Sequence, residues 1–252
     1  MMIRPYRWLA QYYDQLFSSF RFPIDTAREE VLAPILPRVQ TACDLACGTG
    51  TTALIFARKG INMYAVDLSP QMCRLTSEKA DRARLPVVVF RADMRSFRLP
   101  EAVDLITCEY DALNHIPRRA DLRIVANAVH RALRPGGHFY FDVNNARGFC
   151  RYWSGTIWFE KPGMAVVMRN GHNRHADRAW SEMDWFIRDG RCWRRHHERV
   201  EEVCWKSNEI RRVFKQAGFD HLRAWDATPF FTKNLLIDPG CRTIYLAHKV
   251  LG

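Results

Sequence analysis

Two kinds of segment are missing from this sequence of 252 residues. No apolar run approaches the roughly 18 residues that a helix needs to cross a bilayer, and Asp14 and nearby glutamines interrupt any stretch of signal-peptide type. The eight cysteines are dispersed and contain no C-x-x-C pair, so a disulfide scaffold is not indicated. We therefore expect a cytoplasmic protein whose thiols stay reduced.

A basic arm is also missing, although the net charge is +11. Lys and Arg exceed Asp and Glu along the whole chain rather than in one segment. Because nucleic acids are bound mainly by neutralising phosphates, this spread does not favour a nucleic-acid partner. A small anionic substrate would gain from the positive field, and a solvated arginine-rich surface is the plainer explanation.

The most informative segment is Asp44-Leu45-Ala46-Cys47-Gly48-Thr49-Gly50. It follows the end of a predicted strand and precedes a predicted helix over residues 51–58. Gly48 and Gly50 also fit the dinucleotide fingerprint, in which a pyrophosphate lies on a helix N-terminus. A pyrophosphate beside Asp44 would meet a like charge, whereas the ammonium and sulfonium of S-adenosylmethionine would meet an opposite one. The carboxylate therefore favours the methyl donor over NAD.

Further carboxylates follow the next predicted strands. Asp67 ends the apolar run of residues 63–66, where it can accept both ribose hydroxyls of an adenosine. Asp93 and Glu109 follow the predicted strands 87–90 and 103–107. Parallel strands direct such residues to one edge of the sheet, where ligands bind.

Alternating short strands and helices predict an α/β fold, a Rossmann-like seven-stranded sheet with helices on both faces. After Asn145 three extended stretches, 164–173, 178–188 and 191–205, predict an added antiparallel β-sheet with a hairpin at Asp189-Gly190. That sheet would cap the active site or form a subunit contact. Two helices, 5–19 and 25–36, are expected before the core. The expected parts are an N-terminal helical cap (1–40), the cofactor-binding core (41–145), the β insertion (146–206) and the rest of the core sheet (207–252).

The motifs DLACGTG, VDLSPQM, RADM and LRPGG occur in this order over roughly residues 40–145. As an ordered set they resemble the class I S-adenosylmethionine-dependent methyltransferases. The resemblance implies that the turn with Asp44, Ala46, Gly48 and Gly50 holds the methionyl part of S-adenosylmethionine, the donor that leaves as S-adenosylhomocysteine. It further implies that the adenosine part meets Asp67, Leu68, Met72, Asp93 and Met94.

The segment from Glu109 to Pro117 resembles its counterpart in glycine N-methyltransferases and nucleotide-aminosugar N,N-dimethyltransferases, which also carry a histidine in the place of His115. Glu109 and Tyr110 are expected at the cofactor. An imidazole with an ordinary pKa of about 6.5 can take a proton from an incoming ammonium, so His115 is a candidate general base. The alternative is that His115 only packs the loop.

Two residues nearer the start match the same relatives. Tyr13, in Tyr12-Tyr13-Asp14, is the candidate for a tyrosine that closes over the methyl donor and assists catalysis, with core packing as the alternative. Arg28 matches an arginine that pairs with the methionyl carboxylate, a role that suits a guanidinium. Its alternative is an ordinary helix-surface arginine paired with a glutamate.

The acceptor pocket carries no motif, and the candidates for contacts with the substrate are Asp111, Asn114, Asn144 and Trp153. Tryptophans in such strands also serve as core or interface residues. His172, His175, His196 and His197 with Cys192 do not predict a metal site, because successive residues of a strand point to opposite faces. No metal is therefore expected.

These observations predict an S-adenosylmethionine-dependent methyltransferase that acts on a small molecule, most readily on an amine nitrogen. Alternatives are a small-molecule O-methyltransferase, an RNA methyltransferase, a noncatalytic adenosine-ligand module that dimerises through the added sheet, and an NAD-dependent oxidoreductase. The RNA alternative lacks an Asn/Asp-Pro-Pro-Tyr motif after the fourth strand. The expected partners are a small acceptor, which the positive field would allow to be anionic, and a second copy in a homodimer, with no membrane.

Overall fold

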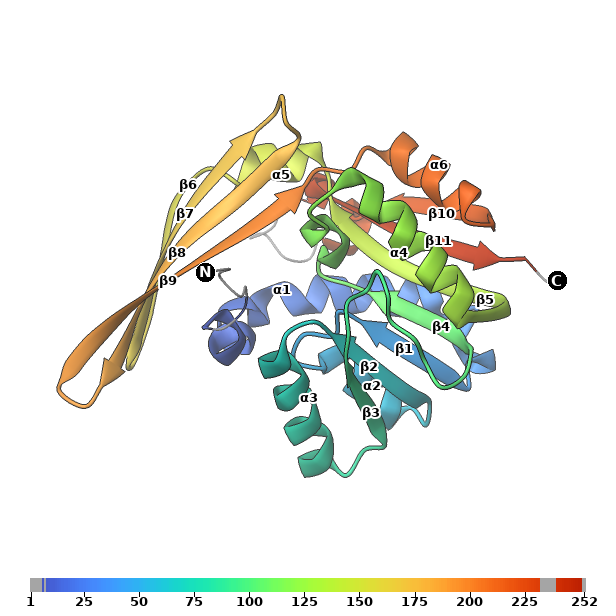
Figure 1. Cartoon of the computed structure of the whole chain (residues 1–252), viewed down its shortest axis with the longest axis horizontal. Coiled ribbons are helices and arrows are strands. Elements are labelled where there is room, and N and C mark those ends of the chain that lie inside the picture. Colours follow the sequence, from blue (N-terminus) through green and yellow to red (C-terminus); the bar gives the residue numbers. More distant parts are fainter. Residues whose placement is uncertain (1–5, 7, 232–238, 251–252) are drawn as a thin grey trace.

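The structure, a computed structural model, describes residues 6, 8–231 and 239–250. Its larger part is a seven-stranded sheet in the order β10-β11-β5-β4-β1-β2-β3 (Figure 1). The strands are β1 (Thr41–Leu45), β2 (Asn62–Asp67), β3 (Val87–Arg91), β4 (Val103–Cys108), β5 (Leu133–Asn144), β10 (Phe219–Asp226) and β11 (Arg242–Lys249).

Six of the seven strands run in the same direction, and only β11 is reversed. β3, β2, β1, β4 and β5 pair in parallel. β11 pairs antiparallel with β5 and with β10. The strand order and the helices on both faces confirm the predicted Rossmann-like seven-stranded sheet.

Helices cover the two faces of this sheet. α1 (Leu9–Leu32) and α2 (Thr51–Arg58) share one apolar core with β1 and β2, and α4 (Arg119–Ala132) and α6 (Ser207–Gln216) share another with β4 and β5. α3 (Pro70–Ala83) lies beside β2 and β3. Its N-terminus confirms the expected signal, because the Ser69 hydroxyl accepts from the Met72 N–H and Pro70 occupies the first turn.

The prediction of two N-terminal helices is wrong. One 24-residue helix, α1, runs from Leu9 to Leu32, and Asp25 lies inside it rather than at an N-cap. Residues 5 and 7 of the expected first helix lie outside the described residues. The start of α1 is capped by a carboxylate from the added sheet, because buried Glu198 accepts from the N–H groups of Trp8 and Leu9 at 2.9 and 3.0 Å.

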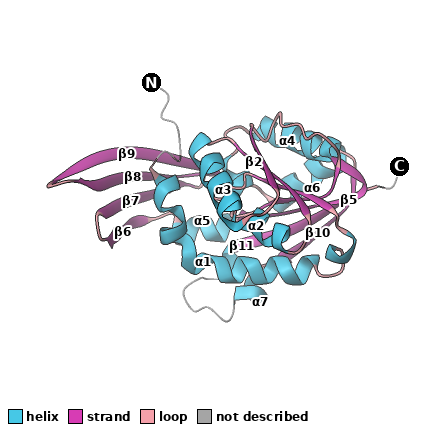
Figure 2. Ribbon diagram, turned by 90° about the horizontal axis from the view of Figure 1, so that it is seen from below, coloured by secondary structure: helices cyan, strands magenta, loops and turns pink. Residues whose placement is uncertain are grey.

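The added antiparallel sheet is confirmed, with four strands where three were expected. They are β6 (Gly155–Lys161), β7 (Met164–Asn173), β8 (Arg178–Asp189) and β9 (Cys192–Val203), in sequential order. The β8–β9 hairpin turns at Gly190 and Arg191, and Gly190 has φ +61°. This sheet projects from the side of the core (Figure 2). One of its faces packs on the first half of α1 through Val166, Met183 and the fully buried Trp185.

Short helices complete the connections, and α5 was not predicted. They are η1 (Leu36–Arg38), η2 (Ala112–His115), α5 (Ala146–Tyr152), α7 (Thr228–Phe231) and η3 (Pro239–Cys241). All eight cysteines are free thiols. Among the described residues, no helix combines the length and apolar character required of a membrane span.

Candidate active site

A cavity of about 690 Å³ opens at the carboxyl ends of β1, β2 and β4, and β9 of the added sheet closes one side of it. Its volume falls within the usual range of small-molecule sites, about 300–1,000 Å³. Of the predicted site residues, the cavity is lined by Tyr13, Asp44, Ala46, Gly48, Asp67, Leu68, Met72, Asp93, Met94, Glu109, Tyr110 and His115.

Asp44 fixes the turn between β1 and α2. Its carboxylate accepts from the Ala53 N–H at 3.1 Å and from the Thr107 hydroxyl at 3.2 Å. Burial and nearby Glu109 raise the pKa of Asp44 to about 7. A cationic ligand group would lower the pKa of Asp44 again, so this carboxylate favours a positively charged ligand.

The turn itself has the backbone that brings a ligand close. Ala46, Gly48 and Gly50 have φ angles of +58°, +54° and +79°. A Cβ on Gly48 would meet no atom within 4 Å, so this position faces open space on the cavity side, whereas one on Gly50 would lie 2.5 Å from Cγ2 of Thr76. Gly48 therefore gives a ligand access to the backbone, and Gly50 lets α3 approach.

Asp67 at the end of β2 is prepared for a ligand with hydroxyl groups. The N–H groups of Gly48 and Ser69 donate to its two oxygens at 2.9 and 2.8 Å. Burial raises its pKa to about 6. Each oxygen keeps a further lone pair, so the carboxylate can accept the two hydroxyls of a ribose from the cavity.

Asp93 and Met94 line the same end of the cavity as Leu68 and Met72. Arg95 holds the Asp93 carboxylate through Nε at 3.0 Å and lowers its pKa. Leu68 is 57% exposed, although it is a large apolar residue. An exposed leucine beside buried Met72 offers apolar contact to the flat base of an adenosine.

Arg28 lies away from the cavity lining and is fully buried. Its Nη1 donates to both oxygens of Glu109 at 3.0 and 3.2 Å, and its Nη2 pairs with Asp25 at 2.8 Å. Thr52 also donates to Glu109, at 2.5 Å. Arg28 therefore anchors Glu109, which does line the cavity, and direct contact of Arg28 with a methionyl carboxylate stays a prediction.

His115 lies at the end of η2 with a quarter of its side chain exposed. Its Nδ1 is 3.3 Å from the backbone carbonyl of Glu201, which can only accept, so this nitrogen carries the proton. Its Nε2 then accepts from the Tyr6 hydroxyl at 2.9 Å. Burial lowers the pKa of His115, and the imidazole is neutral and basic at Nε2 near pH 7.

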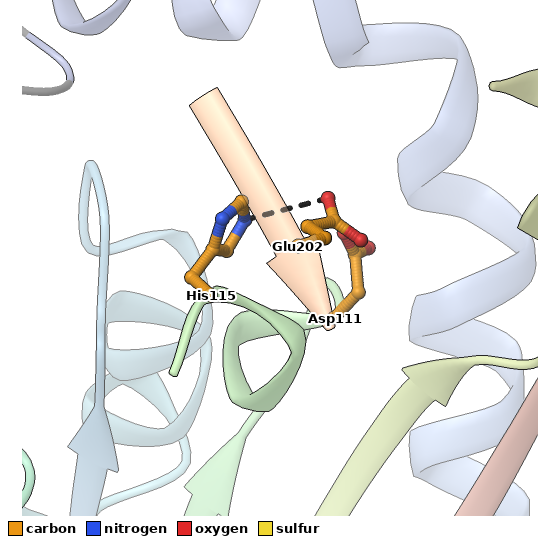
Figure 3. Close-up of side chains that lie close together, drawn as sticks. All are labelled: Asp111, His115 and Glu202. Atoms are coloured by element: carbon orange, nitrogen blue, oxygen red, sulfur yellow. Dashed lines mark ion pairs between the residues drawn. The ribbon is translucent and has the colours of Figure 1, made fainter. Parts of the chain in front are cut away.

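Beside His115 lies a carboxyl pair (Figure 3), formed by Asp111 and Glu202. Glu202 Oε1 is 3.7 Å from His115 Nε2, and Glu202 is buried. Burial raises the pKa of Glu202 well above its ordinary value, and hydrogen bonding to Asp111 raises it further, so Glu202 keeps its proton and donates it to Asp111. The charge of Asp111 in turn raises the pKa of His115.

Arg242 anchors this pair from the other side. It forms ion pairs with Asp111 at 2.5 Å and with Asp142. Asp142 also accepts from the N–H groups of Tyr110 and Asp111, at 2.8 and 3.0 Å, and so holds both residues in their left-handed conformation. Two carboxyl groups and one guanidinium therefore lie together beside neutral His115.

The same cluster has a spacing that could hold a metal ion, because ligand atoms of Asp111, His115 and Glu202 lie within 4.8 Å of one another. Arg242 already supplies the cation for Asp111, and an ion there would lie against its guanidinium. The arrangement therefore favours a proton over a metal. On the added sheet, His197 pairs with Asp184 and Glu182 of β8.

All four predicted acceptor residues lie outside the cavity lining, Asp111 in the carboxyl pair beside His115 and the other three elsewhere. Asn114 is buried and joins η2 to β5 and β9, donating to the carbonyls of Asn144 and Val203 at 3.1 and 2.8 Å. Asn144 donates to Glu202 at 3.3 Å. Trp153 packs beside Phe149 on α5. Their contact with an acceptor stays a prediction.

Sequence reasoning missed several residues of the site. They are Tyr6, Arg178, Arg199, Glu202, Arg242 and Asp142. Glu202 and its neighbour Glu201 are the same residue type, and only the fold shows that one is buried and the other exposed. The period of two along a strand could have indicated that they differ in face, although not which one turns inward.

The fold and site define a class I methyltransferase, and comparisons with known proteins agree. Residues 42–137 match the family model of a methyltransferase domain. The Bacillus subtilis protein YqeM, which its name describes as a methyltransferase, is 24% identical over 85% of this chain and 86% of its own length. An S-adenosylmethionine-dependent methyltransferase structure from Clostridium acetobutylicum is 25% identical, with a TM-score of 0.79 over 97% of this chain and 99% of that one.

A sugar-modifying relative is similar over a shorter stretch. The dTDP-4-amino-2,3,4,6-tetradeoxy-D-glucose N,N-dimethyltransferase of Saccharopolyspora spinosa is 34% identical over 63% of this chain and 57% of its own length. Together these matches support the sequence-based prediction. The protein is an S-adenosylmethionine-dependent methyltransferase, and S-adenosylmethionine is its cofactor.

Proposed function

We propose that this enzyme transfers the methyl group to an amine nitrogen of a small molecule. The observation that carries the proposal is His115, a neutral imidazole of the cavity lining whose Nε2 is the basic nitrogen and whose protonated form would lie near the Asp111 carboxylate, which raises the pKa of His115. That arrangement suits an acceptor that arrives as an ammonium and must lose a proton before it can attack.

S-adenosylmethionine supplies an electrophilic methyl group when it is bound. We assign Asp67 to its ribose, Asp93, Met94, Leu68 and Met72 to its adenine end, and the turn from Asp44 to Gly50 to its methionyl end. Glu109, held by Arg28, faces the cavity beside that turn. The backbone, rather than a catalytic side chain, does much of this positioning, which is the main requirement of an in-line displacement.

His115 then accepts one proton from the acceptor ammonium at Nε2, which requires the Tyr6 hydroxyl to yield its place. The freed lone pair attacks the methyl carbon, and the electrons of the carbon–sulfur bond stay on sulfur. Asp111 is the counter-ion of the imidazolium, and Glu202 connects the two through its retained proton. Tyr13 lines the cavity and is assigned to shield it from water.

The acceptor class follows from charges farther along the cavity. Arg178 and Arg199 line it. Arg199 already pairs with Glu182 and Glu201, whereas Arg178 donates to the Pro117 carbonyl without pairing to any carboxylate of the described residues. A phosphate-bearing acceptor would meet the Arg178 guanidinium while its amine lies at His115. An aminosugar nucleotide, the kind of acceptor named for the Saccharopolyspora relative, has both groups.

The added sheet is best assigned as a substrate cap. Its strand β9 contributes Arg199, Val200 and Glu201 to the cavity wall, and its inner face packs on α1. A homodimer through its outer face would be compatible with this role.

The test is turnover of S-adenosylmethionine with separate pools of amines, amino acids, phenols and nucleotide aminosugars. We expect S-adenosylhomocysteine to form with the amine-bearing pools. His115→Gln should lower turnover about 10²–10⁴-fold, the usual contribution of a general base, while binding of S-adenosylhomocysteine is retained. Turnover with phenols alone would instead support O-methylation. Binding of tRNA or rRNA by the protein, tested separately, would support an RNA substrate.

A further inference from the structure

Three histidines lie in one row on the sheet, away from the cofactor cavity. His138 on β5 is the direct partner of His248 on β11, and His248 is the direct partner of His221 on β10. Residues directly opposite one another on antiparallel strands point to the same face of a sheet. The three imidazoles therefore share one face of three neighbouring strands.

The three histidines lie away from the cavity in which the proposed methyl transfer takes place. His138 precedes Asp142 and Asn144 on β5, and it lies beside Leu105 near the start of β4. The cofactor cavity lies at the other end of these strands. A second hollow of about 330 Å³ is lined by the three histidines, by Val31 near the end of α1 and by Ile35 just after the helix.

Asp220 orients one of the imidazoles so that its other ring nitrogen can bind a metal. The Nδ1 of His248 is 2.9 Å from the Asp220 carboxylate. A carboxylate accepts the Nδ1 proton, which leaves Nε2 of His248 as the free lone pair. This pairing of a carboxylate with the non-ligating nitrogen is the usual outer shell of a metal-bound histidine.

The rings are near enough to meet at one ion after a modest turn. The ring centres of His138 and His248 are 4.9 Å apart, and those of His248 and His221 are 6.4 Å apart. The His221 side chain is 79% exposed, and its Nε2 lies 3.5 Å from the Asp220 carboxylate, so this ring must turn from the carboxylate toward the other two imidazoles to reach a shared ion. Arg223 also lines the hollow, but its guanidinium lies 4.7 Å over the ring of Trp225 rather than among the histidines.

We propose that His138, His221 and His248 bind a Zn²⁺ ion, with Asp220 holding the Nδ1 proton of His248 behind them. Three imidazole ligands and a water complete the tetrahedral set that Zn²⁺ prefers. The ion would join the edge strand β10 to β11 and β5. It would take no part in methyl transfer.

The test uses the full chain without a polyhistidine tag, and Zn²⁺ in isothermal titration calorimetry. We expect one ion per chain for the wild type, and at least a tenfold lower affinity in His248→Asn. Asp220→Asn should weaken binding about 10–100-fold, the usual effect of losing the carboxylate behind a ligating histidine. Co²⁺ in place of Zn²⁺ should give the visible absorption of a tetrahedral site in the wild type and not in His248→Asn.

Two matched variants serve as controls for Zn²⁺ binding elsewhere on the chain. His175→Asn removes an exposed histidine in the β7–β8 turn and should leave Zn²⁺ affinity unchanged. His115→Asn should also leave it unchanged. Loss of binding in His115→Asn but not in His248→Asn would place the ion in the active site and overturn the proposal, as would equal binding by all variants or none by the wild type. Each outcome is independent of whether an acceptor amine is found.

Discussion

At the scale of single residues, the cofactor site depends on carboxylates whose charged form is destabilised by burial. Asp44 and Asp67 have pKa values raised to about 7 and about 6, because burial disfavours the charged form of both carboxyl groups. Strongly shifted pKa values are common at functional sites. A bound ligand with cationic or hydroxyl groups would stabilise the charged forms of these two carboxylates.

Asp67 gives the most direct test of the cofactor assignment. Asp67→Asn keeps the shape and removes the charge that would accept two ribose hydroxyls. A hydrogen bond to a charged group is worth about 1.5–3 kcal/mol, so affinity for S-adenosylhomocysteine should fall about tenfold or more in calorimetry. Asp81→Asn makes the same change on the exposed side of α3 and serves as the control. Unchanged affinity in Asp67→Asn would remove the ribose assignment.

Substitutions of Asp111 and of Glu202 should affect the pKa of His115 differently. Because Asp111 raises the pKa of His115, Asp111→Asn should lower that pKa further; Asn also tolerates the positive φ of this position. Glu202 is already neutral, so Glu202→Gln should leave the pKa nearly unchanged.

The measurement is an NMR pH titration of the His115 ring in the free enzyme, which needs no acceptor. Glu160→Gln removes a charge from an exposed position of β6, outside the cavity lining, and is the control. If Glu202→Gln lowered the pKa of His115 as much as Asp111→Asn, Glu202 rather than Asp111 would be the counter-ion.

At the scale of elements, α1 depends on a contact that is remote in sequence. Glu198 on β9 accepts from the N–H groups of Trp8, which precedes the helix, and Leu9, its first residue, and is itself buried. Glu198→Ala leaves those groups without their acceptor and should cost about 1–3 kcal/mol of the free energy of unfolding. Chemical denaturation measures it, with Glu201→Ala as the exposed control on the same strand. A loss no larger than the control would mean that the start of α1 does not depend on β9.

The elements also show where sequence reasoning succeeds. The core strands and α2, α3 and α4 are predictable because apolar periodicity and caps such as Ser69 are local signals. The break expected before Asp25 is absent, because Ile24, Ala27 and Leu32 bury one continuous helical face against the sheet. β6 escapes prediction because nearly all of Gly155–Lys161 is exposed and shows no alternation.

The residues of the site likewise divide into those that sequence motifs predict and those that only the fold reveals. Asp44, Gly48, Asp67 and Asp93 belong to short motifs that follow strands of a known order, so their meeting at one edge is predictable. The acceptor side draws on Tyr6, η2, β9 and Arg242, which lie far apart along the chain. No local pattern states that these segments meet, and the fold alone brings them together.

At the scale of the whole molecule, the cofactor cavity joins the two sheets, since the core supplies most of its wall and β9 the remainder. A ligand that binds only the folded protein stabilises it by about 2.7 kcal/mol at 100 times its dissociation constant. S-adenosylhomocysteine should therefore raise the thermal midpoint in a concentration-dependent way, measured by calorimetry. NADH serves as the control and should cause no shift. A shift with NADH and none with S-adenosylhomocysteine would return the glycine turn to a dinucleotide-binding role.

The central claim is methyl transfer from S-adenosylmethionine to an amine nitrogen. Its most direct measurement uses donor labelled with ¹³C in the methyl group and an aminosugar nucleotide as acceptor, with the product examined by NMR. The account predicts the label on nitrogen, with the matched hydroxyl-bearing sugar nucleotide left unmodified. Label on oxygen would contradict the claim.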